Sequence, residues 1–191
     1  MSMGFYFDTN RCIGCCTCMI ACKGKNELEA GTNFRTVAHY EVGKYPEATV
    51  THMSLSCQHC ENPACLAACA AGAIYKNEEG IVLIDAEMCD GCGACVEICP
   101  YGAPAIVPET GKAGKCDSCV ALRAKGQQPA CVEACLTRCL MFGDMTELKA
   151  TYGDGLVSEL PCTPEAFMTN PNLLIKASDA ALSAEFAERF F

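Results

Sequence analysis

Residues 89–100 read CDGCGACVEICP, a run that places four cysteines within eleven positions and closes on a proline. A related spacing recurs in three further groups of four cysteines, and every group begins with C-x-x-C and ends with C-x-x-x-C. The four groups are Cys12, Cys15, Cys18 and Cys22; Cys57, Cys60, Cys65 and Cys69; Cys89, Cys92, Cys95 and Cys99; and Cys116, Cys119, Cys131 and Cys135. An internal repeat of this kind calls for one chemical explanation.

The spacing within the groups distinguishes between two metal chemistries. A structural zinc site is built from two separated C-x-x-C pairs that complete one tetrahedron. In the first and third groups a third cysteine follows the second after only two residues, and a single ion would leave that thiolate unused. An iron–sulfur cubane can take three close cysteines, while the fourth reaches a neighbouring cluster, as in two-cluster ferredoxins. The sequence therefore predicts iron–sulfur clusters, with zinc as the alternative.

Composition limits the other possibilities. The chain has 191 residues and 19 cysteines, an odd number in a chain too long for a typical disulfide scaffold. No secretory signal is recognisable, because MSMGFYFDTN runs from the initiator straight into a predicted strand. The formal net charge of −9 would repel a phosphate backbone, so no nucleic-acid partner is predicted. No apolar run approaches the roughly 18 residues that cross a bilayer, so no direct membrane span is predicted. No nucleophile elbow, P-loop or dinucleotide fingerprint indicates catalysis on this chain.

The order of the groups predicts the fold. Residues 73–85, AIYKNEEGIVLID, read as a β-hairpin around an Asn-Glu-Glu-Gly turn. Two cysteine groups, short helices and this hairpin predict a ferredoxin-like dicluster unit at 52–103. The first and fourth groups share the same start and end spacing, and together they predict a second, discontinuous unit made of 1–51 and 104–160. The predicted class is α+β, with two bacterial-ferredoxin-like dicluster units, one inserted in the other, and irregular loops.

Crossover ligation within each unit assigns four cysteines to each of four clusters. The predicted ligands are Cys12, Cys15, Cys18 and Cys135 for cluster 1; Cys22, Cys116, Cys119 and Cys131 for cluster 2; Cys57, Cys60, Cys65 and Cys99 for cluster 3; and Cys69, Cys89, Cys92 and Cys95 for cluster 4. Cys16, Cys139 and Cys162 are left over as small buried thiols. Because Cys131, Cys135 and Cys139 are spaced by four, a helical stripe there would allow a different choice of ligand. His59, inside CQHC, is predicted to be a packing or hydrogen-bonding neighbour rather than a ligand.

Two further features concern charge and docking. Arg11, Lys23 and Lys115 stand beside motifs and could raise cluster potentials, with a solvated surface position as the alternative. The segment 161–191 is predicted to be a docking tail, because ASDAALSAEFAERFF places its apolar side chains on one face of a helix. Those side chains are Leu182, Phe186 and Phe190. A membrane-surface helix would need an opposite basic face, and only Arg189 is present, so docking on the body or on a partner subunit is expected.

Over nearly the whole chain the motifs resemble the electron-transfer subunit of the dimethyl sulfoxide reductase family, the small partner of a molybdopterin enzyme. The motifs that carry the resemblance are DTNRCIGCCTCMIACK, SCQHCENPAC, CDGCGACVEICPYGAP, KCDSC, PACVEAC and PNLLIK. The resemblance implies a non-catalytic subunit that relays single electrons through four [4Fe–4S] clusters in anaerobic respiration. Related nitrate reductases replace one cysteine with tryptophan and hold a three-iron cluster, but this chain has no tryptophan and four complete groups.

The resemblance also implies partners and a location. A molybdopterin-containing catalytic subunit would lie nearer clusters 1 and 2, and a quinol-linked membrane anchor subunit or another redox donor nearer clusters 3 and 4. The complex would be peripheral on the cytoplasmic membrane, on the exported face by co-export with the catalytic subunit, with a cytoplasmic location as the alternative. A free polyferredoxin is the rival function, although the YGAP segment and the apolar tail favour a docked subunit. A radical enzyme would need C-x-x-x-C-x-x-C, which no group has.

Overall fold

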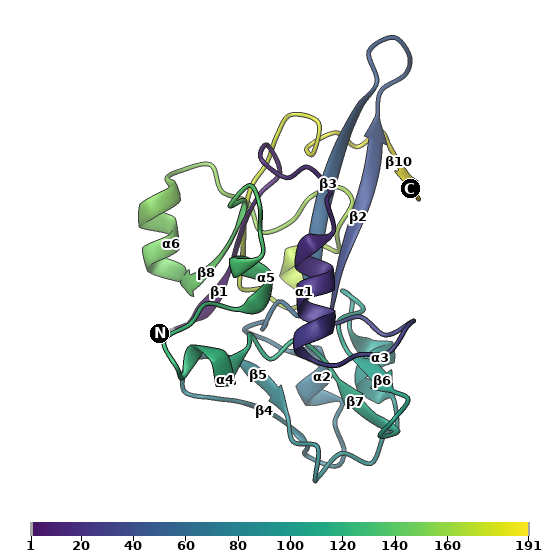
Figure 1. The fold of residues 1–191 in the computed structure, drawn as a ribbon, viewed down its shortest axis with the longest axis vertical. Helices are drawn as coiled ribbons and strands as arrows, with labels where there is room; N and C mark the ends of the chain where they lie inside the picture. The colour runs from purple at the N-terminus through teal and green to yellow at the C-terminus, as the bar shows by residue number, and fades with distance from the viewer. Residues whose placement is uncertain (1, 191) are drawn as a thin grey trace.

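The computed structural model describes residues 2–190, which combine short strands and short helices in a mixed α and β fold (Figure 1). The strands are β1 (Met3–Asp8), β2 (Arg35–Val42), β3 (Thr49–Ser56), β4 (Ile74–Lys76), β5 (Val82–Ile84), β6 (Ala105–Val107), β7 (Lys112–Gly114), β8 (Leu140–Asp144), β9 (Leu173–Lys176) and β10 (Phe186–Arg189). The helices are α1 (Thr17–Lys25), α2 (Ala64–Ala67), α3 (Ala94–Ile98), α4 (Val120–Arg123), α5 (Ala130–Glu133), α6 (Met145–Tyr152) and the 3-10 helix η1 (Ala166–Met168).

The first sheet has the order β8-β1-β9. Strand β1 confirms the strand expected directly after the N-terminus; it runs antiparallel to β8 and parallel to β9. Its residues from Gly4 to Asp8 are all buried, because the sheet is covered on both faces. Phe5 meets Phe142 of β8 edge to face at 4.9 Å, and Phe7 and Ile175 are completely buried. This sheet therefore anchors both the start and the later part of the chain in one core.

The second sheet is built on a long hairpin that projects from the body, as Figure 1 shows. Strands β2 and β3 pair antiparallel over their whole length, from Arg35 opposite Ser56 to Val42 opposite Thr49. The body end of this hairpin is buried and its far end is exposed. The hairpin thus carries its buried end, with Arg35, into the region of the cysteines.

The C-terminal segment is not the helix that we predicted. Strand β10 pairs antiparallel with β2, with Phe186 opposite Val42 and Arg189 opposite His39. The Phe186 ring meets Tyr40 edge to face at 5.3 Å. The edge of β2 leaves a row of backbone N–H and C=O groups to be paired, and the tail supplies the partners for them. The fourfold spacing of the apolar residues was therefore misread as a helical face, although the segment does dock on the body.

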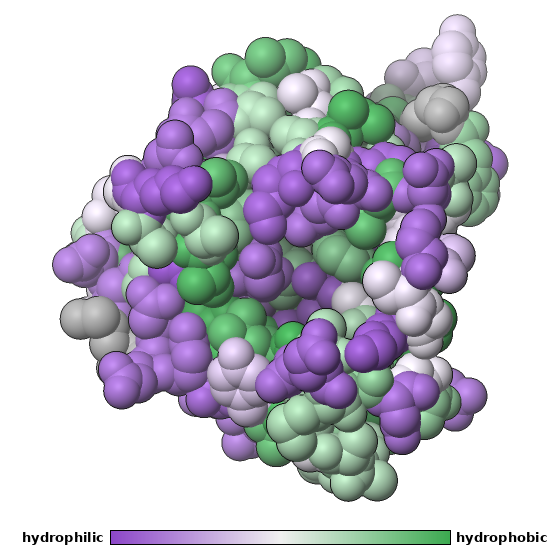
Figure 2. Space-filling model, turned by 60° about the horizontal axis from the view of Figure 1, so that its bottom comes forward, coloured by the Kyte–Doolittle hydropathy of each residue, from purple (hydrophilic) through white to green (hydrophobic). Residues whose placement is uncertain are grey.

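Two hairpins and two short helices gather at the opposite end of the molecule (Figure 1). Strands β4 and β5 form the hairpin predicted at 73–85, which is confirmed, and β6 pairs with β7 in the same antiparallel way. In Figure 2, which brings this end forward, hydrophobic side chains reach the surface in patches between hydrophilic ones. A small core here combines Ala113 of β7 with Cys65, Cys95, Ile74 and Val82. The insertion of one dicluster unit in the other stays a prediction.

Helices α1 and α5 lie against one another near the first sheet. Helix α5 ends at Glu133, so Cys135 and Cys139 lie beyond it and the helical stripe that we considered is absent. Chain reversals keep the helices short; Cys119, for example, has a left-handed backbone with φ of 52°. In the described part of the chain, 2–190, no helix is both long and apolar enough to cross a bilayer.

Candidate iron–sulfur sites

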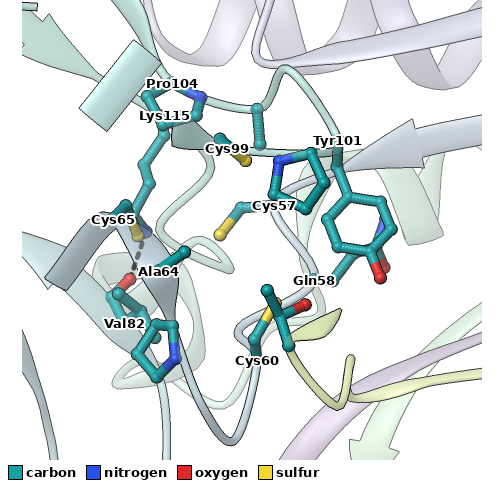
Figure 3. A pocket seen from close by; sticks show the side chains of 14 residues that line it. Cys57, Gln58, Cys60, Ala64, Cys65, Val82, Cys99, Tyr101, Pro104 and Lys115 are labelled. Atoms are coloured by element: carbon teal, nitrogen blue, oxygen red, sulfur yellow. Dashed lines mark hydrogen bonds between the residues drawn. The ribbon is translucent and has the colours of Figure 1, made fainter. Parts of the chain in front are cut away.

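The cysteines predicted to bind cluster 3 surround one cavity (Figure 3). Figure 3 shows the sulfur atoms of the four side chains directed into a common space below Pro104 and beside Tyr101. They come from the loop after β3, from helix α2 and from the end of helix α3, so the groups at 57–69 and 89–99 meet here. The cavity is lined by Cys57, Cys60, Cys65 and Cys99.

Two further cavities have the same character. One is lined by the predicted ligands of cluster 4, which are Cys69, Cys89, Cys92 and Cys95. The other is lined by the predicted ligands of cluster 1, which are Cys12, Cys15, Cys18 and Cys135, and also by Cys16 and Cys139. Each of the three cavities is small and has the four predicted ligands of one cluster in its wall. The same set of four thiols around each cavity fits one kind of cluster repeated in each.

The predicted ligands of cluster 2 form the most enclosed set. Cys22 on α1 and Cys131 on α5 are brought together by the packing of these helices, and Cys116 and Cys119 complete the set; all four are buried. Burial, followed by the charge of the Cys116 thiol, raises the pKa of Cys22 to about 12. Thiolates crowded in this way need a compensating positive charge, which iron supplies when it binds.

Exposure differs between the sets in a regular way. Cys15 in the first set and Cys92 in the fourth are exposed. The second set is completely buried, and in the third set only Cys99 is even partly exposed. Two of the four sets therefore reach the surface, and the other two are enclosed by protein.

The loops that carry the cysteines approach other parts of the chain closely. Gly14 has a φ of 66°, and a Cβ atom there would collide with the ring of His52. Gly91 has a φ of 74°, and a Cβ there would collide with the backbone carbonyl of Gly111. Glycine is required at both positions by conformation and by space, as well as by any approach to inorganic sulfide.

A buried guanidinium lies between the first two sets. Arg35 is only 2% exposed and donates hydrogen bonds to Ser54 Oγ at 2.9 Å and Ser56 Oγ at 2.8 Å. Its Cζ lies 4.7 Å from the centre of the Phe5 ring. Burial alone would lower the pKa of Arg35, but the thiols of both sets, with that of Cys131 acting most strongly, raise it. Sequence reasoning missed this residue because it belongs to no motif.

Lys115, which sequence reasoning did single out, lies in the wall of the cluster 3 cavity. It is 6% exposed and donates to the carbonyl oxygens of Val82 and of Cys116, the second at 3.2 Å; Figure 3 shows the first contact as a dashed line. Burial would raise the pKa of Cys57, but the Lys115 ammonium, together with the backbone N–H of His59, lowers it to about 5. Fixed positive charge therefore stands beside this set of thiols.

Of the three leftover cysteines, Cys16 and Cys139 both line the cluster 1 cavity, and the second of them, Cys139, contacts a predicted ligand. It is buried, and its Sγ lies 3.4 Å from Cys135 Sγ. Cys135 and Cys139 both line the cluster 1 cavity, whereas Cys162 lies apart, packed against the main core. Across residues 2–190, no three His, Cys, Asp or Glu side chains converge as ligands of a single metal ion.

Comparison with known proteins gives consistent matches. Residues 48–145 match the family described as a 4Fe-4S dicluster domain. The chain is 41% identical over 181 residues to the B subunit of anaerobic dimethyl sulfoxide reductase from Escherichia coli K12, covering 91% of this chain and 87% of the relative. It is 38% identical over 176 residues to the B subunit of polysulfide reductase from Wolinella succinogenes, covering 90% and 92%. It is 42% identical over 144 residues to the thiosulfate reductase electron transfer subunit PhsB of Salmonella typhi, covering 73% and 74%.

Proposed function

The chain belongs to the family of iron–sulfur electron-transfer subunits of the dimethyl sulfoxide reductase type, and from this premise we propose that it relays single electrons through four [4Fe–4S] clusters. When bound, the clusters supply one-electron oxidation and reduction. The chain itself binds them through thiolates, excludes water from them and sets the charge around them. We propose no bond-making or bond-breaking catalysis on this chain.

The proposed ligands are the four sets described above. For cluster 1 they are Cys12, Cys15, Cys18 and Cys135; for cluster 2, Cys22, Cys116, Cys119 and Cys131; for cluster 3, Cys57, Cys60, Cys65 and Cys99; and for cluster 4, Cys69, Cys89, Cys92 and Cys95. Thiolates in a water-poor pocket are the donor set that iron–sulfur clusters use. The matching sets of four thiols around three cavities support the same cluster type at clusters 1, 3 and 4.

The observation that carries the proposal is the pattern of exposure. A relay between two partners needs surface access at its two ends and protection in between. The sets with an exposed cysteine, at Cys15 and Cys92, are those proposed for clusters 1 and 4. We propose that the electron passes along the clusters in their numerical order, so these two sets are the ends of the relay.

Apolar side chains beside the two ends support docking partners. Ile13 and Leu136, next to the cluster 1 cysteines, are 60% and 69% exposed, and Met88, beside Cys89, is 52% exposed. Exposed apolar groups of this kind mark interaction surfaces when they form patches. We propose that a molybdopterin-containing catalytic subunit docks at the cluster 1 end. A membrane anchor subunit, or another redox donor, docks at the cluster 4 end.

The relatives are named as components of anaerobic dimethyl sulfoxide reductase and of polysulfide and thiosulfate reductases. By analogy we propose a role in anaerobic respiration, in a complex that is peripheral on the cytoplasmic membrane and on its exported face. A cytoplasmic-facing complex and a free polyferredoxin are the alternatives that the following experiment distinguishes.

The test is native mass spectrometry of the protein purified without oxygen from its own host, together with iron and sulfide analysis. We expect about sixteen irons per chain, from four clusters of four, in a complex that contains molybdopterin. A lone chain with the same iron content would favour the polyferredoxin. Zinc in place of iron and sulfide would overturn the proposal, and protease protection in intact spheroplasts would report the side of the membrane.

A further inference from the structure

His59 lies where the two proposed dicluster units meet. Its side chain is completely buried, at 0% exposure, between Cys57, a proposed ligand of cluster 3, and Cys116, a proposed ligand of cluster 2. Its ring stacks on Phe5 with a centroid distance of 6.5 Å and an interplanar angle of 25°. A buried polar ring between two thiols of different sets needs a hydrogen-bonding role.

The backbone of His59 is held in an unusual conformation. Its φ is 46°, in the left-handed region that residues other than glycine seldom adopt. The side chain of Asn172 donates to the His59 carbonyl oxygen at 2.7 Å, and the Asn172 backbone N–H donates to the carbonyl oxygen of Gln58 at 3.0 Å. These contacts hold the turn that directs the ring inward. Strain that neighbouring groups maintain in this way points to a function for the side chain.

The hydrogen bonds of the ring identify the nitrogen that carries the proton. The backbone N–H of Val82 donates to His59 Nδ1 at 3.2 Å, so Nδ1 is an acceptor. The ring proton is therefore on Nε2. Nε2 is buried and has no hydrogen-bond partner within the described residues. A buried N–H donor without a partner costs about 1–3 kcal/mol, so an acceptor of some kind is expected there.

The Cys116 side chain lies within hydrogen-bonding reach of the His59 ring, which makes its sulfur the acceptor at hand. The two residues are linked through Val82, whose N–H binds the ring while its carbonyl shares the Lys115 ammonium with the Cys116 carbonyl. Cys57 Sγ lies 3.9 Å from Nδ1. The ring thus stands with Nδ1 toward the cluster 3 ligand Cys57 and Nε2 free to donate toward the cluster 2 ligand.

We propose that His59 is a positioning residue that joins cluster 2 to cluster 3, with its Nε2–H donating a hydrogen bond to the Cys116 thiolate. The inference rests on the proposed ligation of those clusters by Cys116 and Cys57. A hydrogen bond to a ligating sulfur stabilises the reduced cluster and so raises its reduction potential. His59 therefore makes cluster 2 a better acceptor for the electron that crosses between the two units.

The experiment compares His59→Leu and His59→Gln with the wild-type complex in redox titrations followed by EPR. Leucine removes the donor, and we expect the midpoint potential of cluster 2 to become more negative while those of clusters 1 and 4 stay unchanged. Glutamine keeps an N–H donor of similar reach, and we expect it to restore most of the shift. An unchanged cluster 2 potential in His59→Leu, or equal shifts in both variants, would overturn the inference.

Pulsed EPR of wild-type protein labelled with ¹⁵N-histidine tests the same bond without a variant at this position, in case His59→Leu fails to take up clusters. We expect a nitrogen coupling to reduced cluster 2, and its retention in His52→Leu, a control that removes another histidine. Absence of the coupling would overturn the inference. An iron content far below sixteen in the wild type would instead contradict the proposed function, so the two failures are distinguishable.

Discussion

Replacing Arg35 by methionine removes a buried positive charge from between the proposed clusters 1 and 2 and keeps an unbranched side chain there. The guanidinium Nη1 contacts Ser54 Oγ at 2.9 Å, and that oxygen lies 3.4 Å from Cys18 Sγ. Because both contacts share the serine oxygen, Nη1 lies within about 6 Å of a proposed ligand of cluster 1. Its Nε is buried and has no hydrogen-bond partner among residues 2–190.

The size of the effect follows from Coulomb's law. At an effective dielectric constant of about 20, unit charges about 6 Å apart interact by about 3 kcal/mol, and at about 10 Å by about 1.7 kcal/mol. An added electron is shared over a whole cluster, so these distances bracket the interaction. The potentials of clusters 1 and 2 should therefore fall by roughly 70–120 mV in Arg35→Met. Clusters 3 and 4, which lie farther away, should change little.

The assay is an EPR-monitored redox titration of the complex, with single Cys→Ser variants used to assign each signal. Arg35→Lys is the matched control because it keeps the charge but loses the two-pronged contact with Ser54 and Ser56. It should shift the potentials by less than Arg35→Met does. Equal shifts of all four clusters in Arg35→Met, or no shift of clusters 1 and 2, would refute the reasoning.

Three further predictions concern ligands and stability. Cys135→Ser should lose cluster 1 and about a quarter of the iron, whereas Cys139→Ser should keep all four clusters, as iron analysis will show. Glu79→Gln breaks the bidentate contact with Arg123, at 2.9 and 3.1 Å, and should lower the apparent melting temperature at neutral pH by about 2–4 °C. The hydrogen bond from Arg123 lowers the pKa of Glu79, so this stabilisation is complete above the ordinary carboxyl pKa and is lost as the pH falls through the lowered one. Gly91→Ala should prevent assembly of cluster 4, seen as a missing EPR signal, because its Cβ would collide with the β6–β7 turn.

Each of these has a result that would count against it. Loss of iron in the Cys139 variant but not in the Cys135 variant would show that Cys139, and not Cys135, is the ligand of cluster 1. A melting difference for Glu79→Gln that persisted unchanged at low pH would exclude the ion pair as its source. A Gly91→Ala protein with four intact clusters would show that the loop can move away from the turn.

The sequence alone was sufficient to predict the metal chemistry, the hairpin at 73–85 and the N-terminal strand. These features depend on residues close together in the chain, such as the two-residue gaps between Cys89, Cys92 and Cys95, where covalent geometry limits what the side chains can bind. The same local reasoning was wrong for the tail, because the spacing of Leu182 and Phe186 carries no information about the free edge of β2.

Only the tertiary structure decided which groups surround the proposed clusters. Arg35 stands in no motif, and it comes beside the thiols because the β2–β3 hairpin enters the core at that end. His59 could be recognised as a neighbour of two cysteines, but not as a ring whose Nδ1 is occupied by Val82, far along the chain. The energy of a buried charge or hydrogen bond depends on distance and on exclusion of water, and both are set by contacts between segments that the sequence keeps apart.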